Sequence, residues 1–294
     1  MRLQMRTDLA MEAKELWHQD AGETTKLPGV RAREYHVRGI DVTVVEILNA
    51  EGARALQKPM GNYVTLSLEK GMLREPAGFS RAAGQLGKTL ARMLPGNGPV
   101  LVAGLGNSAV TPDAVGPRCL EHLVVTRHLG GSFPQLRPVS AIAPGVLGTT
   151  GLESVEVVRG IVERSQPCCV IVVDALASRS LDRLCTTVQI TDTGITPGSG
   201  VGNHRAAFDR QTLGVPVLAV GVPTVVEART LLRDVLEENG VKQAETAGSC
   251  DRSLVVTPKD IDARVCHISR LLGYGISLGL HKSLSVADIS CFVG

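Results

Sequence analysis

The sequence predicts an α/β protein in which a mostly parallel sheet carries helices on both faces. Short apolar runs, typical of buried strands, alternate with longer segments whose apolar residues recur at helical spacing. This alternation predicts parallel pairing, because a helix brings the chain back across the sheet before the next strand begins. Hydrophobic residues make up 44% of the 294 residues, which is ample for a sizeable core.

The N-terminal part of the chain predicts a short helix and a β extension. Weak helical character is present at residues 12–17, and strand-like segments follow at 42–48 and 63–68. A polar stretch with turn residues separates the two strand-like segments. We therefore expect residues 30–70 to form a small β extension or the edge of the main sheet.

The rest of the chain supplies the main alternation. The predicted strands cover residues 100–103, 139–143, 169–173, 187–190, 215–220 and 254–256. The predicted helices cover residues 80–94, with Ser80 as N-cap, and 112–128, 152–165, 225–238 and 258–272.

Charge, apolar runs and cysteines exclude several classes of protein. The formal net charge is only +2 and no stretch collects Lys or Arg densely, so neither nucleic acid nor an anionic membrane is expected as a partner. No run approaches the roughly 20 apolar residues of a membrane span, and no apolar signal core is present, which predicts a cytoplasmic protein. The seven cysteines include no C-x-x-C pair and no zinc-ligand spacing, so reduced thiols are expected.

Two aspartates share the same position relative to predicted strands. The strand at 100–103 is followed by a glycine turn and by Thr111, the expected N-cap of a helix, which puts Asp113 in the first helical turn. Asp174 directly follows the apolar run 168–173. Because the carboxyl ends of parallel strands open into one crevice, we expect the two carboxyl groups to meet there.

Two carboxyl groups that share a site can divide the work of hydrolysis. Like charges ionise together with difficulty, so one group keeps a proton near neutral pH. The ionised group then takes a proton from attacking water, and the protonated group polarises the amide carbonyl and helps to protonate the leaving nitrogen. We expect the helix start to favour the charged form of Asp113 and the apolar strand to raise the pKa of Asp174. Taken singly, each acid is equally explained as a helix-start residue or a loop cap.

Three other interpretations stay open at this stage. Two carboxylates and an imidazole such as that of His204 could hold a divalent cation, as in a metal-dependent peptidase. Residues 104–109 fit the G-x-G-x-x-G/A fingerprint of a dinucleotide-binding oxidoreductase, although the expected helix begins too late for it. Asp192 opens the tripeptide D-T-G of the β-barrel aspartic proteases, but in an alternating α/β chain a turn aspartate is the better explanation.

Two glycine-rich loops follow predicted strands. The first contains Gly145 and Gly148, and the second contains Gly198 and Gly200. Glycine supplies positive φ in tight turns, which alone justifies most of these positions. It also lets a substrate backbone approach closely, so these four glycines are candidate substrate-binding residues.

Eight motifs in one order carry a family resemblance. They are RTDLAMEA (6–13), VEILNAEGARALQKPMGNYVTL (45–66), GLGNSAVTPDAVGP (104–117), RPVSAIAPGVLGTTG (137–151), VVDALASRS (172–180), TDTGITPGSGVGN (191–203), GVPTVV (221–226) and VTPKDID (256–262). Together they cover nearly the whole chain and resemble the bacterial germination proteases, which start the degradation of small acid-soluble spore proteins.

The resemblance implies a fold, an activity and a setting. It implies a three-layer α/β/α sandwich, similar in its core to the hydrogenase-maturation peptidases, and an atypical aspartic-type endopeptidase with Asp113 and Asp174 as its catalytic acids. We expect no cofactor and no bound metal. The resemblance further implies a homotetramer in the cytoplasm of the spore core that acts on DNA-protecting proteins without binding DNA.

The resemblance also implies an inactive precursor that removes its own N-terminal segment. Cleavage sites of the family have an acidic residue, a large apolar residue and then alanine, a pattern that Asp8, Leu9 and Ala10 match. We therefore expect self-cleavage between Asp8 and Leu9, which divides the chain into a propeptide of residues 1–8 and a single α/β peptidase domain of residues 9–294. The plainer interpretation of this segment is a helix N-terminus.

Overall fold

The computed structural model of the protein describes residues 7–21, 27–130, 132–199, 205–238 and 254–293. Within these ranges nine strands form one sheet. They are β1 (Val30–Val37), β2 (Ile40–Ile47), β3 (Gly61–Leu68), β4 (Val100–Gly104), β5 (Val139–Ile142), β6 (Cys169–Ser178), β7 (Thr187–Thr191), β8 (Val217–Glu227) and β9 (Val255–Val256).

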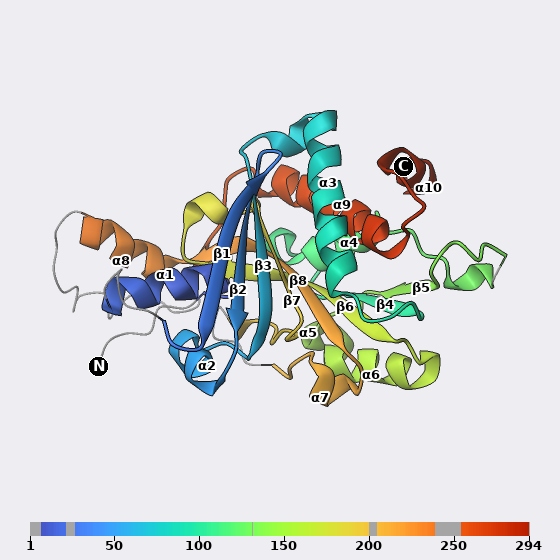
Figure 1. Ribbon diagram of the computed structural model, residues 1–294, viewed down its shortest axis with the longest axis horizontal. Coiled ribbons are helices and arrows are strands. Elements are labelled where there is room, and N and C mark those ends of the chain that lie inside the picture. The colour runs from blue at the N-terminus through green and yellow to red at the C-terminus, as the bar shows by residue number, and fades with distance from the viewer. Residues whose placement is uncertain (1–6, 22–26, 131, 200–204, 239–253, 294) are drawn as a thin grey trace.

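The sheet has a parallel part and an antiparallel part. The strand order is β1-β2-β3-β7-β8-β6-β4-β5, and β9 pairs with β8. Pairing is parallel from β8 through β6 and β4 to β5, and every other pair in this sheet is antiparallel. The expected β extension is present as β1, β2 and β3, which continue the sheet beyond β7 (Figure 1).

Helices cover both faces of the sheet. The α-helices of the described chain are α1 (Ala10–Ala21), α2 (Ala50–Leu56), α3 (Pro76–Met93), α4 (Val115–Leu120), α5 (Leu147–Thr150), α6 (Ser154–Ser165), α7 (Arg210–Leu213), α8 (Ala228–Glu238), α9 (Ile261–Leu280) and α10 (Val286–Val293). Short 3₁₀ helices are η1 (Met72–Arg74), η2 (Thr111–Asp113), η3 (Arg127–Leu129) and η4 (Leu181–Arg183).

The two faces of the sheet belong to separate apolar clusters. On one face Leu86 of α3 and Ile276 of α9 pack with Ile171 of β6, and on the other Val158 of α6 packs with Val170 of the same strand. Successive residues of a strand point to opposite faces, so the apolar run of β6 supplies both clusters. The result is the expected three-layer α/β/α sandwich (Figure 1).

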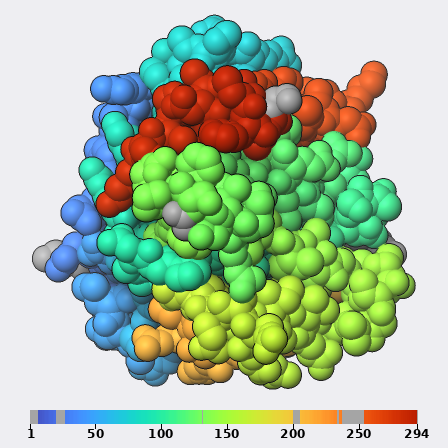
Figure 2. Space-filling model, turned by 90° about the vertical axis from the view of Figure 1, so that its right-hand side faces the viewer, coloured from blue at the N-terminus to red at the C-terminus, as the bar shows by residue number. Residues whose placement is uncertain are grey.

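Figure 2 shows these layers from the side of β5. A cyan segment lies at the top, the C-terminal segment lies beneath it in red, the segment around β5 lies in the middle in green, and the segment that contains α6 lies below in yellow-green.

Several boundaries differ from the sequence expectation for local reasons. The sequence did not predict β1, because its residues are mostly exposed and several are charged, and within the described sheet the strand lies at the edge beside β2. The helix expected at 112–128 is divided into η2, α4 and η3. Ser80 is not a cap: α3 already begins at Pro76, whose carbonyl accepts the Ser80 hydroxyl hydrogen bond. The expected helix at 225–238 begins later, since β8 continues to Glu227.

Candidate active site

The segment that carries Asp113 and the start of α4 packs directly on the end of β4 and on the middle of β6. A Cβ on Gly104, the last residue of β4, would lie 2.4 Å from Gly116 O. A Cβ on Gly116 would in turn lie 2.6 Å from Val173 O on β6. Glycine is therefore required where backbone meets backbone, and these glycines serve the packing of the Asp113 loop. Because α4 begins only at Val115, they do not form the helix start that a dinucleotide fingerprint needs.

Asp113 is held by the backbone of its own loop. Asn107 N–H donates a hydrogen bond of 2.7 Å to Asp113 Oδ2. Burial raises the pKa of Asp113, although this hydrogen bond and the positive charge of Arg205 act in the opposite direction. The expectation that a helix start would favour the charged form is wrong, because Asp113 ends a three-residue 3₁₀ turn and burial outweighs the donors. Thr111 is not a cap either, since its hydroxyl donates to Asp262 Oδ1 at 2.7 Å.

Asp174 lies inside β6 and not, as the sequence suggested, just beyond its end. The strand continues to Ser178, and Asp174 is paired in register with Gly221 of β8. Its side chain is 4% exposed, and Oδ1 accepts a hydrogen bond of 2.9 Å from Ala175 N–H. The continuation of the strand explains how a carboxyl group can be buried in the middle of the sheet.

The pKa of Asp174 is raised well above its ordinary value. Burial is the largest cause, and the negative charges of Asp113 and then Asp8 add to it. The expected direction for Asp174 is therefore confirmed. The interaction also brings together the two acids that the sequence selected, which we call the acid pair. Since both pKa values are raised, the pair retains a proton to higher pH than isolated aspartates do, and it can supply an acid and a base at one place.

Arg205 is a member of this site that the sequence analysis missed. Its positive charge lowers the pKa of both Asp113 and Asp174, so we count Arg205 among the charges around the acid pair. The residue follows the glycine-rich segment after β7, in which we chose glycines and not a charged residue as candidates. Gly200 and His204, from the same segment, lie outside the described residues.

Asp8 lies against the same stretch of β6. Its N–H donates to Ala177 O at 3.1 Å, and Ala177 N–H donates back to Asp8 Oδ2 at 2.9 Å. The other carboxylate oxygen, Oδ1, accepts a hydrogen bond of 2.9 Å from Ser199 Oγ. Asp8 also lines a cavity of about 260 Å³ together with Lys58, Gly221 and other residues of β3, β7 and β8; we call it the Asp8 cavity.

The residues on both sides of Asp8 are fixed as well. Lys58 Nζ donates a hydrogen bond of 2.9 Å to Thr7 O. Gln189 Nε2 donates to Asp8 O at 3.1 Å, while Gln189 Oε1 accepts from Ala10 N–H at 2.7 Å. Leu9, which stands between these contacts, is completely buried. The segment around Asp8 is therefore held at both its backbone and its side chains.

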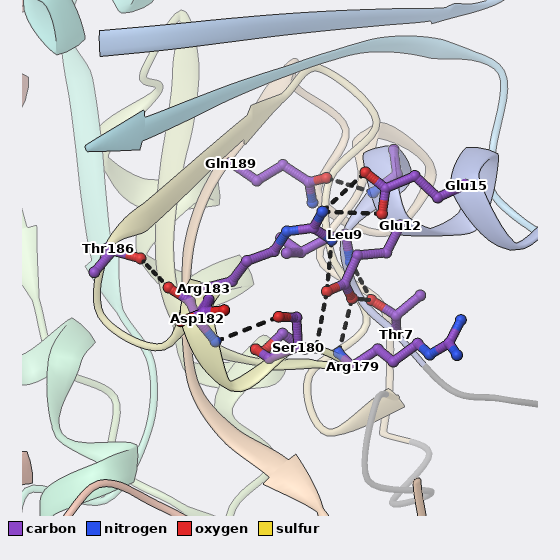
Figure 3. A network of polar contacts seen from close by, with 12 residues as sticks. Thr7, Leu9, Glu12, Glu15, Arg179, Ser180, Asp182, Arg183, Thr186 and Gln189 are labelled. Carbon is purple, nitrogen blue, oxygen red and sulfur yellow. Dashed lines mark hydrogen bonds and ion pairs between the residues drawn. The ribbon is translucent and has the colours of Figure 1, made fainter. Parts of the chain in front are cut away.

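The first turn of α1 is anchored by a second polar cluster, shown in Figure 3. Glu12 is 1% exposed and accepts hydrogen bonds from Arg179 N–H at 2.8 Å and Ser180 N–H at 3.1 Å. It also forms an ion pair of 2.7 Å with Arg183 and accepts the hydroxyl of Thr7. We call Glu12 and these three residues after β6 the α1 anchor. Thr7 thus contacts Glu12 and does not cap the helix by itself, although its Oγ1 accepts Leu9 N–H at 3.1 Å.

The described candidate glycines fall at different places. Gly198 has φ +73° and directly precedes Ser199, which contacts Asp8. Gly145, with φ +76°, lies in the loop before α5, and its carbonyl accepts a hydrogen bond of 2.7 Å from Ser154 Oγ. A Cβ on Gly148 would meet open space. Neither Gly145 nor Gly148 lines the Asp8 cavity, so of the described glycines only Gly198 adjoins a residue that holds Asp8.

The D-T-G tripeptide is a turn, as the sequence analysis preferred. Asp192 follows β7 and accepts hydrogen bonds from Asn62 N–H at 2.8 Å and Asn62 Nδ2 at 2.6 Å. Its role is to tie β7 to β3. In the part of the chain that the structure describes, no group of three or more His, Cys, Asp or Glu side chains is arranged to hold a metal ion. No helix among the described residues is long and apolar enough to span a membrane.

Comparison with known proteins places this geometry in a family. The germination protease family model matches residues 10–241. The germination protease of Caldanaerobacter subterraneus is 41% identical over 98% of both chains, and that of Clostridium tetani is 38% identical over 99% of this chain and all of its own. The germination protease of Bacillus pumilus is 35% identical over 98% of this chain and 96% of its own.

Among solved structures, the [NiFe] hydrogenase maturation protease HycI from Thermococcus kodakarensis is similar to this chain. The match covers 64% of this chain and 98% of the HycI chain. The TM-score is 0.36 and the identity 16%. The family assignment comes from the sequence relatives and not from this likeness.

Proposed function

The chain belongs to the germination protease family and is therefore a protease, and we propose that it is an endopeptidase that uses the acid pair to activate water. Its proposed substrates are small acid-soluble spore proteins. No covalent intermediate is required, because water is the nucleophile.

The observation that carries this proposal is the raised pKa of the buried Asp174, to which the charge of Asp113 contributes. An acid whose pKa is raised by a neighbouring acid keeps its proton while the neighbour is ionised, so the two can hold one proton between them over a range of pH. The ionised carboxylate removes a proton from water as the water oxygen bonds to the amide carbon. The protonated carboxyl donates a hydrogen bond to the carbonyl oxygen, and a proton passes to the nitrogen as the C–N bond breaks. We assign these roles to the pair as a unit.

We further propose that the protein is made as a precursor and cuts itself between Asp8 and Leu9. The support is electrostatic and geometric: the charge of Asp8 raises the pKa of Asp174, and Asp8 is hydrogen-bonded to Ala177, three residues along the same strand. Residues 1–8 are then the propeptide and residues 9–294 the single peptidase domain. The proposed setting is the spore core, and the proposed assembly is a homotetramer.

Site-directed variants test the acid pair. Asp113→Asn and Asp174→Asn should each lower the rate of cutting of a small acid-soluble spore protein by at least about 10³-fold, because an amide can neither accept nor share the proton. Asp182→Asn is the matched control, since Asp182 is exposed and its contact is an ion pair of 2.8 Å with Lys70. Near-normal cutting by either acid-pair variant would contradict the proposal, as would loss of wild-type activity to a chelator.

N-terminal sequencing tests the precursor. Incubated full-length protein should acquire Leu9 as its first residue, and the Asp174→Asn variant should keep Met1. A new start at another residue, or processing that continues in the Asp174→Asn protein alone, would contradict self-cleavage at this bond.

A further inference from the structure

The contacts around Asp8 lead to an inference about how a peptide is recognised. We propose that Ser199 Oγ and Ala177 N–H bind the acidic side chain before the cleaved bond, and that the Gln189 amide binds the carbonyl of that bond. The inference rests on the proposed function, in which the Asp8–Leu9 bond is cut. In this arrangement residues 7–10 occupy the positions that a protein substrate takes later.

The main chain of the peptide docks on an open edge of the central sheet. On the side of β4, pairing of β6 ends where Gly104 lies opposite Val173, while on the other side β8 accompanies β6 to Ser178. In this open stretch Asp8 N–H donates to Ala177 O at 3.1 Å. Addition of a peptide to a free strand edge is a general mode of recognition, because backbone hydrogen bonds bind any sequence in a fixed register.

The acidic side chain is selected by donors. Asp8 Oδ2 accepts from Ala177 N–H and Oδ1 accepts from Ser199 Oγ, each at 2.9 Å. A carboxylate accepts at both oxygens in charge-assisted hydrogen bonds, whereas a neutral asparagine amide has one acceptor and can only donate its NH₂ group to the Ser199 hydroxyl in a weaker bond. The Lys58 ammonium adds attraction: burial lowers its pKa, but the negative charges of Asp8 and Glu12 act against that shift. The site therefore favours an acidic residue over its amide.

The carbonyl of the proposed cleaved bond has its own donor. Gln189 Nε2 donates to Asp8 O at 3.1 Å, and Gln189 Oε1 accepts from Ala10 N–H at 2.7 Å. The side-chain amide of Gln189 thus spans the Asp8–Leu9 bond. It holds the carbonyl oxygen of Asp8 before the bond and the N–H group of Ala10 after it. A fixed donor at the carbonyl oxygen stabilises the negative charge that develops there during attack by water. Gln189 is 6% exposed, so water competes little for these contacts.

The acidic subsite can be tested with two synthetic peptides. One has the sequence of residues 4–13, and the other carries Asp8→Asn. Wild-type protein that has completed self-cleavage should cut the Asp peptide at least about 10-fold faster, as kcat/KM, than the Asn peptide. Ser199→Ala should lower kcat/KM for the Asp peptide about 10-fold, through KM, and leave the Asn peptide nearly unchanged. Ser80→Ala is the control, because Ser80 is exposed and donates to a backbone carbonyl within its own helix.

The carbonyl contact can be tested with an isosteric variant. Gln189→Glu keeps an acceptor for Ala10 N–H but loses the donor to Asp8 O, so kcat should fall about 10- to 100-fold for both peptides with little change in their ratio. Gln189→Met, which removes both groups, should add a rise in KM. Gln166→Glu is the control, because Gln166 is exposed at the end of α6. Circular dichroism checks that each variant is folded. If both Gln189 variants unfold, the ratio of kcat/KM for the Asp and Asn peptides with Ser199→Ala decides whether the recognition scheme holds.

The outcomes separate this inference from the proposed function. If wild type cuts neither peptide between Asp and Leu, the proposed function fails. If wild type cuts the Asp peptide, but Ser199→Ala keeps the wild-type preference or a folded Gln189 variant keeps the wild-type kcat, the recognition scheme is wrong while the proposed function stands.

Discussion

Asp174, inside β6, and Glu12, beside the residues that follow β6, are two buried carboxylates, 4% and 1% exposed, in different electrostatic surroundings. Glu12 has an arginine, two backbone N–H groups and a hydroxyl. Asp174 accepts a hydrogen bond from the next residue of its own strand and has two further acids nearby. A buried charge needs partners, so Glu12 belongs to the architecture, whereas Asp174 is kept in a state that favours the proton.

Burial alone therefore does not separate a structural acid from a chemical one; the partners of the buried carboxyl group do. A buried carboxylate with hydrogen-bond and ion-pair partners stabilises a fold. A buried carboxyl group with few such partners is tolerated where its raised pKa serves the chemistry of a site. Four predictions test the contrast, beginning with the largest expected change.

The largest effect is expected from Glu12→Ala. It leaves Arg183, Arg179 N–H and Ser180 N–H without their acceptor in the α1 anchor, and breaking a buried ion pair costs about 3–5 kcal/mol. Urea unfolding should therefore show a free energy of unfolding lower by at least about 3 kcal/mol. Glu163→Ala, on the exposed side of α6, is the control. A loss below about 1 kcal/mol would mean that the anchor contributes little.

Asp174→Asn should change the free energy of unfolding at pH 7 in the opposite direction, making the protein more stable. A raised pKa means that the folded state holds the proton more tightly than the unfolded state, so the stability contributed by the protonated form is present below the ordinary value and is lost as pH rises through the folded pKa. Each unit of pKa elevation costs about 1.4 kcal/mol above that range. The Asn variant, which cannot ionise, should be more stable than wild type at pH 7 and should lose this advantage near pH 4.

Urea unfolding of Asp174→Asn and wild type at the two pH values measures this difference. Asp182→Asn serves as the control, because exposure limits its ion pair with Lys70 to a small contribution. If Asp174→Asn were less stable than wild type at pH 7, the charge of Asp174 would have to be compensated.

A smaller effect is expected from Arg205→Ala. Its positive charge lowers the pKa of both acids, so its removal should move the acid limb of the pH–activity profile to higher pH by about 0.5–1 unit. The profile of kcat/KM against pH measures this shift, with Arg164→Ala on α6 as the control. An unmoved limb would show that Arg205 does not face the acid pair in solution.

The smallest effect is expected from Glu15→Gln. Glu15 shares Arg183 with Glu12 but is 48% exposed, compared with 2% for the Glu12 side chain. Exposed ion pairs contribute less than about 1 kcal/mol, so the free energy of unfolding should change by that much at most. If Glu15→Gln lowered the free energy of unfolding as much as Glu12→Ala does, burial of Glu12 would not explain the contribution of the α1 anchor to stability.

The sequence was most informative where the local pattern and the fold agree. The apolar run of β6 and the glycine turn after β4 predicted both parallel strands and both acids, because buried parallel strands have few alternatives. It was less informative about β1, because the exposed and charged residues of this strand give no apolar pattern from which its pairing with β2 could be predicted. It also could not show that β6 continues past Asp174, since that depends on the partner strand β8.

The residues that hold Asp8 could not be found from the sequence. Gln189 stands in an alternating strand, where one polar residue is ordinary, and its partners are about 180 positions away. Ser199 lies in the motif TDTGITPGSGVGN (191–203), of which only glycines were chosen as candidate binding residues, and Arg205 follows this motif. Their contacts depend on how distant segments cross in the folded protein, which no local spacing encodes.

The hydroxyl of Thr7 has a consequence for the processed enzyme. It links two groups, accepting from Leu9 N–H at 3.1 Å and donating to Glu12. A cut between residues 8 and 9 would release Thr7 with the propeptide, so Glu12 would lose a donor and the Leu9 amide would become an ammonium group at the start of α1. The nitrogen of Leu9 would thereby lose the hydroxyl that accepts its hydrogen bond, so the same cut that ends the precursor would loosen the position that a substrate takes later.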